Sequence, residues 1–267
     1  MNREQLVAEI FRKKSFLCVG LDTDEQKLPE GLEGYDEPVF EFNRRIIDAT
    51  RDHCVSYKLN TAFYECLGAR GWEIMSKTIQ YIGDTHFVIA DAKRGDIGNT
   101  SDMYARAFFN DLGADAVTVA PYMGRDSVEP FLEYEDKSTI LLALTSNAGG
   151  KDFQLLQSDG LELYKQVLKT SQTWKGAARL MYVVGATRAG YLQEIRRYIP
   201  DAFLLVPGVG AQGGSLADVV KYGRNKEIGL LINASRSVIY ASSGSDFAEA
   251  AALEARKMAA EMAELAF

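Results

Sequence analysis

The chain has 267 residues, a net charge of −7 at pH 7 and a pI of about 5.1, with 47% hydrophobic and 25% charged residues. These values are typical of a globular protein and argue against a basic nucleic-acid-binding protein. No apolar stretch approaches the roughly 18 residues of a membrane span, and the charged first turns do not resemble a secretory signal. The three cysteines have no metal-ligand spacing. We therefore expect a cytoplasmic protein with reduced thiols that binds neither membrane nor nucleic acid.

Short β-branched apolar runs alternate with longer amphipathic segments along the whole chain. The short runs favour buried strands, and apolar residues at helical spacing favour helices between them. The predicted strands are 16–22, 55–60, 86–93, 116–120, 139–145, 180–185, 202–207 and 228–234. The predicted helices include 38–51, 71–82, 101–111, 161–173 and 246–265.

The number and spacing of these elements indicate the fold class. Strands that recur about every 30 residues, each followed by a helix, are typical of a (β/α)8 barrel of ~250 residues. An open doubly wound sheet is the alternative, but residues 19–24 (VGLDTD), at the end of the first strand, lack its Gly-x-Gly-x-x-Gly fingerprint. No Pro- or Ser-rich linker divides the chain. We predict an α/β fold, with a single (β/α)8 TIM barrel over residues 1–267.

The hexapeptide 91–96 (DAKRGD) places four charged side chains at the end of a predicted buried strand. Period-two alternation predicts that Asp91 and Lys93 share one face, with Asp96 in the loop beyond. Charges at such a place contribute little to folding, because desolvating ions is costly unless they are paired. A solvated loop with an ion pair is the simple alternative to a reactive site.

Other predicted strands also end in polar residues. The active site of a barrel lies at the carboxyl ends of its strands. Lys58 lies in an otherwise apolar strand, and Asp91 on the next strand is its natural partner. A polar cap on the barrel rim explains one or two such residues, but poorly explains lysines and aspartates at three successive strand ends. The candidates are Asp22, Lys58, Asn60, Asp91, Lys93, Ser146, Asn233, Ser235 and Arg236.

A separate pattern predicts a phosphate site. Residues 207–214 (PGVGAQGG) follow the seventh predicted strand, and Arg236 follows the eighth. Barrels frequently bind phosphate with these two loops. Glycines allow backbone N–H groups to approach an anion, and arginine adds a bidentate fork.

Histidine is scarce. His53 and His86 are the only two, and their positions favour surface or strand-edge residues over catalysts. The sequence also lacks a Gly-x-Ser-x-Gly nucleophile elbow. A serine hydrolase is therefore disfavoured.

Taken together, these motifs resemble the orotidine 5'-phosphate decarboxylase family, and in particular its longer bacterial branch. The resemblance extends over essentially the whole chain, and the hexapeptide is its most specific part. The glycine-rich motif alone is shared with other phosphate-binding barrels. The residues that carry the resemblance are 19–22, 58–65, 91–97, 207–214 and 235–236.

The resemblance implies cofactor-free and metal-free decarboxylation of orotidine 5'-phosphate to uridine 5'-phosphate, in pyrimidine biosynthesis. Lys93 then stabilises the C6 carbanion and protonates it. Asp91 lies close to the departing carboxylate, and Lys58 orders Asp91 and touches the ribose. Asp96 completes the catalytic set.

The resemblance also implies substrate-binding residues and a homodimer. Asp96, Ile97 and Thr100 then reach into the neighbouring subunit's site. Ser235 stands where many members have glycine, which puts a close backbone approach to the phosphate there in doubt. The implied ligands are Asp22 and Asn60 for the ribose, Ser146 for the pyrimidine amide, Gln212 and Arg236 for the phosphate, and also Ile97, Thr100 and Ser235.

Two other functions stay open. A related sugar-phosphate lyase or decarboxylase, such as a hexulose-phosphate synthase, has a similar Asp-x-Lys-x-x-Asp pattern but uses Mg²⁺. A non-catalytic nucleotide-binding barrel is the third candidate. The intact set of lysines and aspartates argues against a pure binder, which needs no such concentration of charge.

Overall fold

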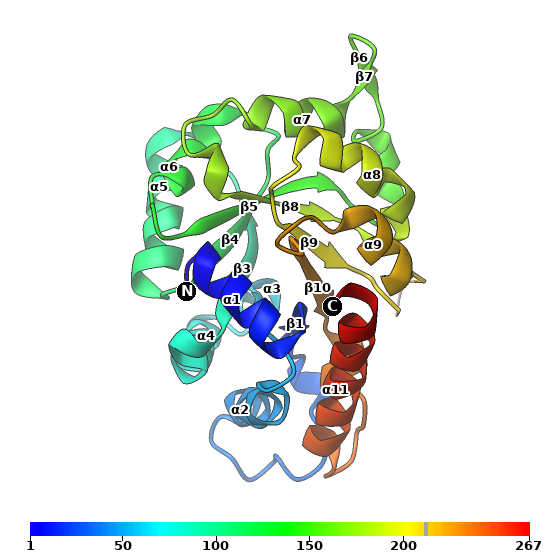
Figure 1. Ribbon diagram of the computed structural model, residues 1–267. Coiled ribbons are helices and arrows are strands. Elements are labelled where there is room, and N and C mark those ends of the chain that lie inside the picture. Colours follow the sequence, from blue (N-terminus) through cyan, green and yellow to red (C-terminus); the bar gives the residue numbers. More distant parts are fainter. Residues whose placement is uncertain (211–212) are drawn as a thin grey trace. The chain divides into compact units, whose positions relative to one another are not determined.

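The computed structural model describes residues 1–210 and 213–267 (Figure 1). Its main sheet is a closed barrel with the strand order β1-β10-β9-β8-β5-β4-β3-β2. The (β/α)8 prediction is confirmed, and each predicted strand is present with small shifts at its ends. The strands are β1 (Leu17–Gly20), β2 (Ser56–Asn60), β3 (Phe87–Arg94), β4 (Ala116–Val119), β5 (Ser138–Leu144), β8 (Leu180–Val184), β9 (Leu204–Pro207) and β10 (Leu230–Ala234).

The strands are parallel where their register is resolved, for example Gly20 opposite Lys58 and Asn60 opposite Asp91. Parallel strands covered on both faces have continuous apolar runs instead of alternating ones. β1, β4, β8 and β10 accordingly consist of buried residues throughout. The carboxyl ends of the strands therefore hold the polar residues that the sequence singles out.

Contacts divide the chain into two compact units. The first unit comprises Met1–Ala92, Phe108–Asp115 and Asn233–Phe267, and the second comprises Lys93–Ala107 and Ala116–Ile232. Each unit is described by itself below. The interpretation of residues 1–267 as one domain stays a prediction.

In the first unit, helices start and pack as their sequences dictate. Asn2 and Gln5 form a reciprocal capping box at the start of α1. α2 begins with Pro38 and buries an apolar face, and Phe42 stacks on Phe247 of α11 with ring centroids 5.1 Å apart (Figure 1). The helices of this unit are α1 (Arg3–Lys13), α2 (Pro38–Thr50), α3 (Ala62–Glu65), α4 (Ala69–Ile82), α10 (Arg236–Ile239) and α11 (Phe247–Ala266), with short turns at Glu25–Lys27 and Gly83–Thr85.

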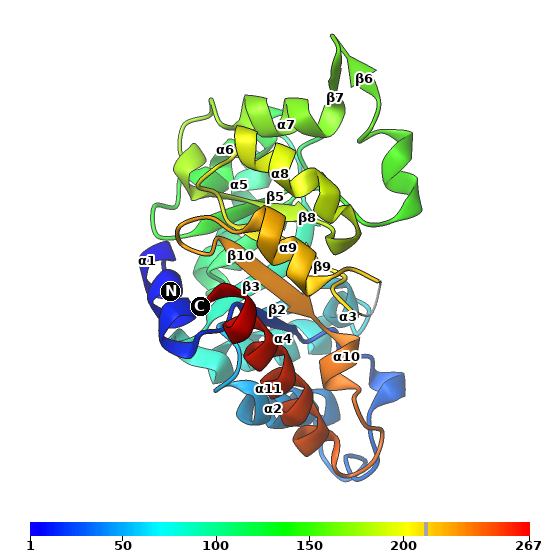
Figure 2. The same ribbon diagram turned by 45° about the vertical axis from the view of Figure 1, so that its right-hand side comes forward.

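The second unit contains an element that the sequence patterns did not predict. A hairpin of β6 (Gln157–Ser158) and β7 (Leu161–Glu162) projects next to α7 (Figure 2). It takes the first residues of the predicted helix 161–173. The helices of this unit are α5 (Gly98–Arg106), α6 (Glu129–Leu132), α7 (Leu163–Ser171), α8 (Ala189–Tyr198) and α9 (Leu216–Gly223), with short turns at Arg125–Ser127, Ala148–Asp152, Ala177–Arg179 and Ala186–Arg188.

Two further features complete the description. The predicted helix 101–111 divides into α5 and a wider turn at Ala107–Asp111. Within the described residues, every helix is too short or too polar to cross a lipid bilayer.

Candidate active site

Three charged side chains of the first unit meet at the carboxyl ends of β1, β2 and β3. Lys58 Nζ donates hydrogen bonds to Asp22 Oδ1 at 3.1 Å and to Asp91 Oδ2 at 2.9 Å. The Lys58 side chain is 5% exposed, and the Asp91 side chain is 11% exposed. A buried ammonium is costly without a partner, so two carboxylates explain how this strand accommodates a lysine. The expected Lys58–Asp91 pair is present, and Asp22 joins it.

The electrostatic state of Lys58 follows from these neighbours. Burial lowers the pKa of Lys58, but the charges of Asp91 and Asp22 and the hydrogen bond to Asp91 outweigh burial and raise the pKa above its ordinary value. Lys58 therefore stays protonated at neutral pH. It is a fixed positive charge and cannot act as a general base.

A buried polar network supports the segment that carries Asp22. Tyr64 Oη donates to the Leu21 carbonyl at 2.9 Å, and Asn43 Nδ2 donates to Tyr64 Oη at 3.1 Å. The Thr23 hydroxyl donates to Asn43 Oδ1 at 2.6 Å. These partners flank Asp22 on both sides and fix its backbone. Sequence reasoning missed Thr23 and Asn43, and a buried-face asparagine in α2 was the available signal.

Lys93 follows Asp91 by two positions on β3 and begins the second unit. Its φ is +49°, a left-handed conformation that non-glycine residues rarely adopt. Such a backbone costs on the order of 1–3 kcal/mol and persists where the surrounding structure holds it, and Lys14, Asp159 and Ile228 also have positive φ values. The Lys93 N–H donates to Thr118 Oγ1 at 2.9 Å, and the residue is exposed. Since β3 continues to Arg94, the prediction that Asp91 and Lys93 share one face stays a prediction.

The loop after β3 is held by its own polar groups. Asp96 Oδ1 accepts from the Ile97 N–H at 2.7 Å, and the Ser101 hydroxyl lies within hydrogen-bonding distance of the Asp96 carbonyl (2.7 Å) and the Ser127 carbonyl (2.8 Å). Asp96 is half-buried, whereas Ile97 is 60% exposed and Thr100 is exposed. The loop thus presents an apolar side chain and a hydroxyl outward.

The loop after β5 carries Ser146. The Gln154 side chain accepts from the Thr145 N–H at 2.8 Å and donates to the Thr145 hydroxyl at 2.9 Å. A Cβ on Gly185 would lie 2.7 Å from the Ser146 backbone nitrogen, so the end of β8 supports this loop closely. Ser146 is half-buried in this position.

The glycine-rich loop after β9 closes on itself. The Gly210 N–H donates to the Gly214 carbonyl at 2.9 Å, and the Gly214 N–H donates to the Gly208 carbonyl at 3.3 Å. Gly208, Gly210 and Gly213 have φ values of 94°, 70° and 81°, which side-chain-bearing residues adopt rarely. Gln212 lies outside the described residues, so its predicted contact with phosphate stays a prediction.

The remaining candidates belong to the first unit. Asn60 Oδ1 accepts from the Ala62 N–H at 3.2 Å at the start of α3. Arg236 begins α10 and is exposed, and within the described part of the chain no hydrogen bond or ion pair engages its guanidinium. This guanidinium is therefore available to an anion. Ser235 lies directly before it, beside Gly20.

Comparisons with known proteins bear on this set of residues. Residues 15–251 match the sequence model of the Orotidine 5'-phosphate decarboxylase / HUMPS family. Orotidine 5'-phosphate decarboxylase of Flavobacterium johnsoniae is 62% identical over 268 residues, which cover 99% of this chain and 98% of that protein. The corresponding protein of Porphyromonas gingivalis is 58% identical over 266 residues, covering 98% of this chain and 96% of that protein.

The chain belongs to the orotidine 5'-phosphate decarboxylase family. It is thus an enzyme of the carboxy-lyase class.

Solved structures agree with the family assignment. Leishmania donovani OMP decarboxylase superimposes with a TM-score of 0.84 at 35% identity, and the match covers 100% of both chains. Leishmania donovani UMP synthase superimposes with a TM-score of 0.88 at 36% identity. This chain covers 57% of that longer protein, and 100% of this chain is matched.

Within this decarboxylase-family chain, the cation of the buried cluster is a lysine ammonium. Lys58 Nζ lies within 3.1 Å of both the Asp22 and the Asp91 carboxylate. Among the described residues, no group of three or more His, Cys, Asp and Glu side chains is arranged as a metal site.

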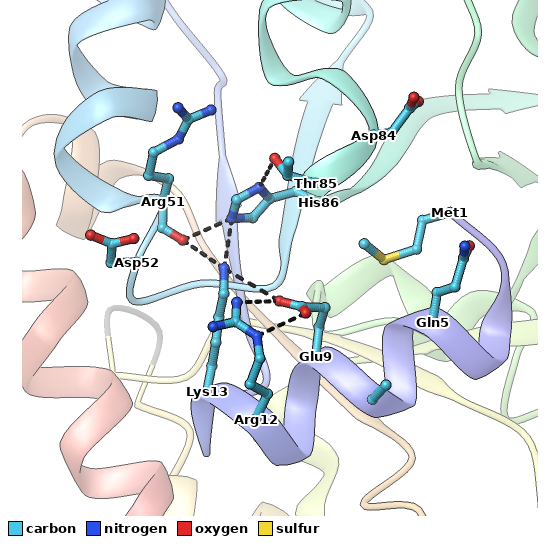
Figure 3. Close-up of a pocket in the computed structure, with 11 residues that line it drawn as sticks. Met1, Gln5, Glu9, Arg12, Lys13, Arg51, Asp52, Asp84, Thr85 and His86 are labelled. Carbon is cyan, nitrogen blue, oxygen red and sulfur yellow. Dashed lines mark hydrogen bonds and ion pairs between the residues drawn. The ribbon is translucent and has the colours of Figure 1, made fainter.

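A polar pocket lies away from this cluster in the first unit, at the amino ends of β2 and β3 (Figure 3). It has a volume of about 550 Å³ and contains none of the predicted site residues. Lys13 Nζ donates to the carbonyls of Arg51 and Cys54 at 2.7 and 2.8 Å and lies 2.9 Å from His86 Nε2. His86 is 3% exposed, so the surface alternative is wrong, whereas its predicted place at a strand edge agrees with its position directly before β3.

Proposed function

We propose that the protein decarboxylates orotidine 5'-phosphate to uridine 5'-phosphate and CO₂ without metal or cofactor, through a C6 carbanion that Lys93 stabilises and protonates. The observation that carries the proposal is the buried Lys58–Asp91–Asp22 cluster, two positions before a lysine held in a left-handed backbone. The names of the relatives support the substrate.

The proposed reaction replaces the carboxylate at C6 of the pyrimidine with a proton. The bond between C6 and the carboxylate carbon breaks, CO₂ leaves, and the electron pair stays on C6. The Lys93 ammonium then transfers one proton to C6 and becomes a neutral amine. A preorganised cation beside the developing charge lowers the barrier because the cation's interaction strengthens in the transition state.

The acidic neighbours have a defined task in this proposal. Asp91 lies beside the departing carboxylate, and its charge favours loss of CO₂ from the bound substrate. Lys58 holds Asp91 at 2.9 Å and prevents it from turning away. Asp22 and Asn60 bind the ribose hydroxyls, and Ser146 binds the pyrimidine amide.

The phosphate end of the substrate binds far from the reacting carbon. The glycine-rich loop, Gln212 and Arg236 hold the dianion, and Ser235 belongs to the same segment. Binding energy from this remote group can be used to close the loop over the site. Arg236 is exposed, and no other described residue engages its guanidinium, which supports its part in this step.

A cytoplasmic homodimer completes the proposal. Asp96, Ile97 and Thr100 of each chain reach the neighbouring site, where Asp96 restrains Lys93. The segments after β3 and β4, including α5, expose large apolar side chains, which favours a protein partner there. They are Ile97, Met103, Tyr122 and Met123, which are 60%, 44%, 89% and 47% exposed.

One assay tests the reaction against its rivals. The absorbance of orotidine 5'-phosphate is followed with wild-type protein and with Lys93→Ala, each with and without EDTA. Wild-type turnover in EDTA, with a loss of about 10⁴-fold or more in the variant, is the expected result. Lys27→Ala, at an exposed lysine, is the matched control and is expected to keep wild-type turnover.

Other outcomes contradict the proposal in different ways. Loss of activity in EDTA would favour the magnesium-dependent lyase. Tight binding of uridine 5'-phosphate by a wild-type protein without turnover would favour the non-catalytic barrel. Substantial turnover by a folded Lys93→Ala variant would remove Lys93 as the proton donor.

A further inference from the structure

Within the first unit, Ser235, which follows β10, packs closely against Gly20 at the end of β1. We call this contact the interlock. A Cβ built on Gly20 would overlap the Ser235 hydroxyl oxygen and would lie 2.9 Å from Ser235 Cβ. The Ser235 side chain therefore lies directly over the Gly20 Cα. A methyl group at position 20 would force the Ser235 side chain to move.

Asn233, near the end of β10, stabilises this contact with two hydrogen bonds. Its side-chain nitrogen donates to Ser235 Oγ at 3.3 Å, and its oxygen accepts from Cys18 Sγ at 3.7 Å. Asn233 is 9% exposed, so a buried amide is used to hold a hydroxyl. Satisfying a buried amide in this way rigidifies the local backbone.

Ser235 directly precedes Arg236, so its backbone conformation sets the direction of the Arg236 side chain. Its φ and ψ of −109° and −90° are neither helical nor extended. Its carbonyl accepts from the Val238 and Ile239 N–H groups at 2.9 and 3.0 Å, which starts α10. Fixing the Ser235 side chain thus fixes the direction in which the exposed Arg236 leaves the barrel.

We infer that Asn233 and Ser235 are positioning residues that aim Arg236 at the substrate phosphate by interlocking with Gly20. This inference rests on the proposed function for the identity of the anion. It gives Ser235 a role besides the predicted contact with phosphate, because its hydroxyl oxygen lies against Gly20 and accepts from Asn233. The same contact ties the Arg236 segment to β1, which leads two residues later to Asp22.

Ligand binding separates positioning from general support. Uridine 5'-phosphate and uridine differ only in the phosphate, and both are titrated by calorimetry into wild type, Ser235→Ala and Asn233→Ala. We expect each variant to weaken uridine 5'-phosphate about 10-fold and to leave uridine within about 2-fold. Equal weakening of both ligands would overturn the inference, because a merely structural role affects them alike.

A double-mutant experiment tests whether Ser235 affects nucleotide binding through Arg236. Arg236→Ala is combined with Ser235→Ala, and the affinity for uridine 5'-phosphate is measured again. If Ser235 acts through Arg236, the second substitution adds less than about 2-fold to the first. A full, additive 10-fold loss would show that Ser235 acts independently and would contradict the inference.

The close packing of Ser235 on Gly20 predicts that a second substitution restores nucleotide binding to a Gly20 variant. Gly20→Ala is expected to weaken uridine 5'-phosphate by about 100-fold and to lower the melting temperature, because its methyl group meets Ser235. Adding Ser235→Gly removes both the hydroxyl and the Cβ and is expected to restore at least about 10-fold. Ser237→Ala, at an exposed serine in the same turn, is the matched control and should restore nothing. No rescue by Ser235→Gly would overturn the interlock.

These readouts do not depend on turnover. If wild type fails to decarboxylate orotidine 5'-phosphate, the proposed function fails. The comparison of nucleotide with nucleoside and the Gly20 rescue still decide the positioning role.

Discussion

At the scale of single residues, Lys58 shows how a charge is kept inside a folded protein. Its side chain is 5% exposed, and two carboxylates within 3.1 Å replace the water that it loses. Removing the lysine takes away the cation that the Asp22 and Asp91 carboxylates share. The cost is expected to be large because breaking a buried ion pair leaves poorly hydrated charge behind.

Lys58→Ala is therefore expected to lower the free energy of unfolding by about 3–5 kcal/mol at pH 7. Urea denaturation followed by circular dichroism measures the loss. Lys77→Ala is the matched control, since Lys77 pairs with Glu37 at 2.7 Å while its side chain is 47% exposed. An exposed pair contributes about 0–1 kcal/mol, so a similar cost for both variants would contradict the argument.

At the scale of elements, the Lys13–His86 contact ties α1 to the end of α2 and the start of β3 (Figure 3). Burial and the neighbouring Lys13 ammonium lower the pKa of His86 from 6.5 to about 4, although hydrogen bonding to the Arg51 carbonyl and the Glu9 carboxylate oppose the shift. The ring is therefore neutral in the folded protein at neutral pH. The Tyr57 ring, with its centroid 5.1 Å away, and the Thr85 hydroxyl complete its surroundings.

This pKa predicts an acid-sensitive stability. As the pH falls below 6.5, the unfolded chain binds a proton at position 86 while the folded protein does not, until the pH reaches about 4. The fold should lose on the order of 3 kcal/mol across this window through this histidine. His86→Gln is expected to flatten the decline in urea denaturation between pH 7 and pH 4. His53→Gln is the control, and an unchanged slope in His86→Gln would contradict the prediction.

The elements also show where local patterns were sufficient. The strand predictions succeeded because buried parallel strands are short apolar runs between polar segments, which is a local property. The predicted helix 161–173 lost its first residues to the β6–β7 hairpin, whose pairing of Ser158 with Leu161 has no strong local signal. Asn43 and Thr23 are 20 positions apart, so their hydrogen bond could not be read from either motif.

At the scale of the whole molecule, the proposed dimer predicts complementation between inactive chains. Lys93→Ala and Asp96→Ala are purified separately, mixed in equal amounts and allowed to exchange subunits. If each site takes Lys93 from one chain and Asp96 from the other, hybrids carry one intact site, and about a quarter of wild-type activity should appear.

The matched mixture is Lys93→Ala with Lys58→Ala. Both residues serve the same site of the same chain in the proposal, so their hybrids have no intact site and should stay inactive. Activity in both mixtures, or in neither after subunit exchange is verified, would contradict shared sites.

The sequence by itself determined the strand order along the chain and the positions of the charged residues at the strand ends, because alternation and burial are encoded over a few neighbouring residues. The tertiary structure decided which of these residues meet. Asp22 joined Lys58 across 36 positions, Ser235 closed over Gly20, and His86 was buried under Lys13. Such contacts depend on how distant segments pack, and no local pattern contains that information.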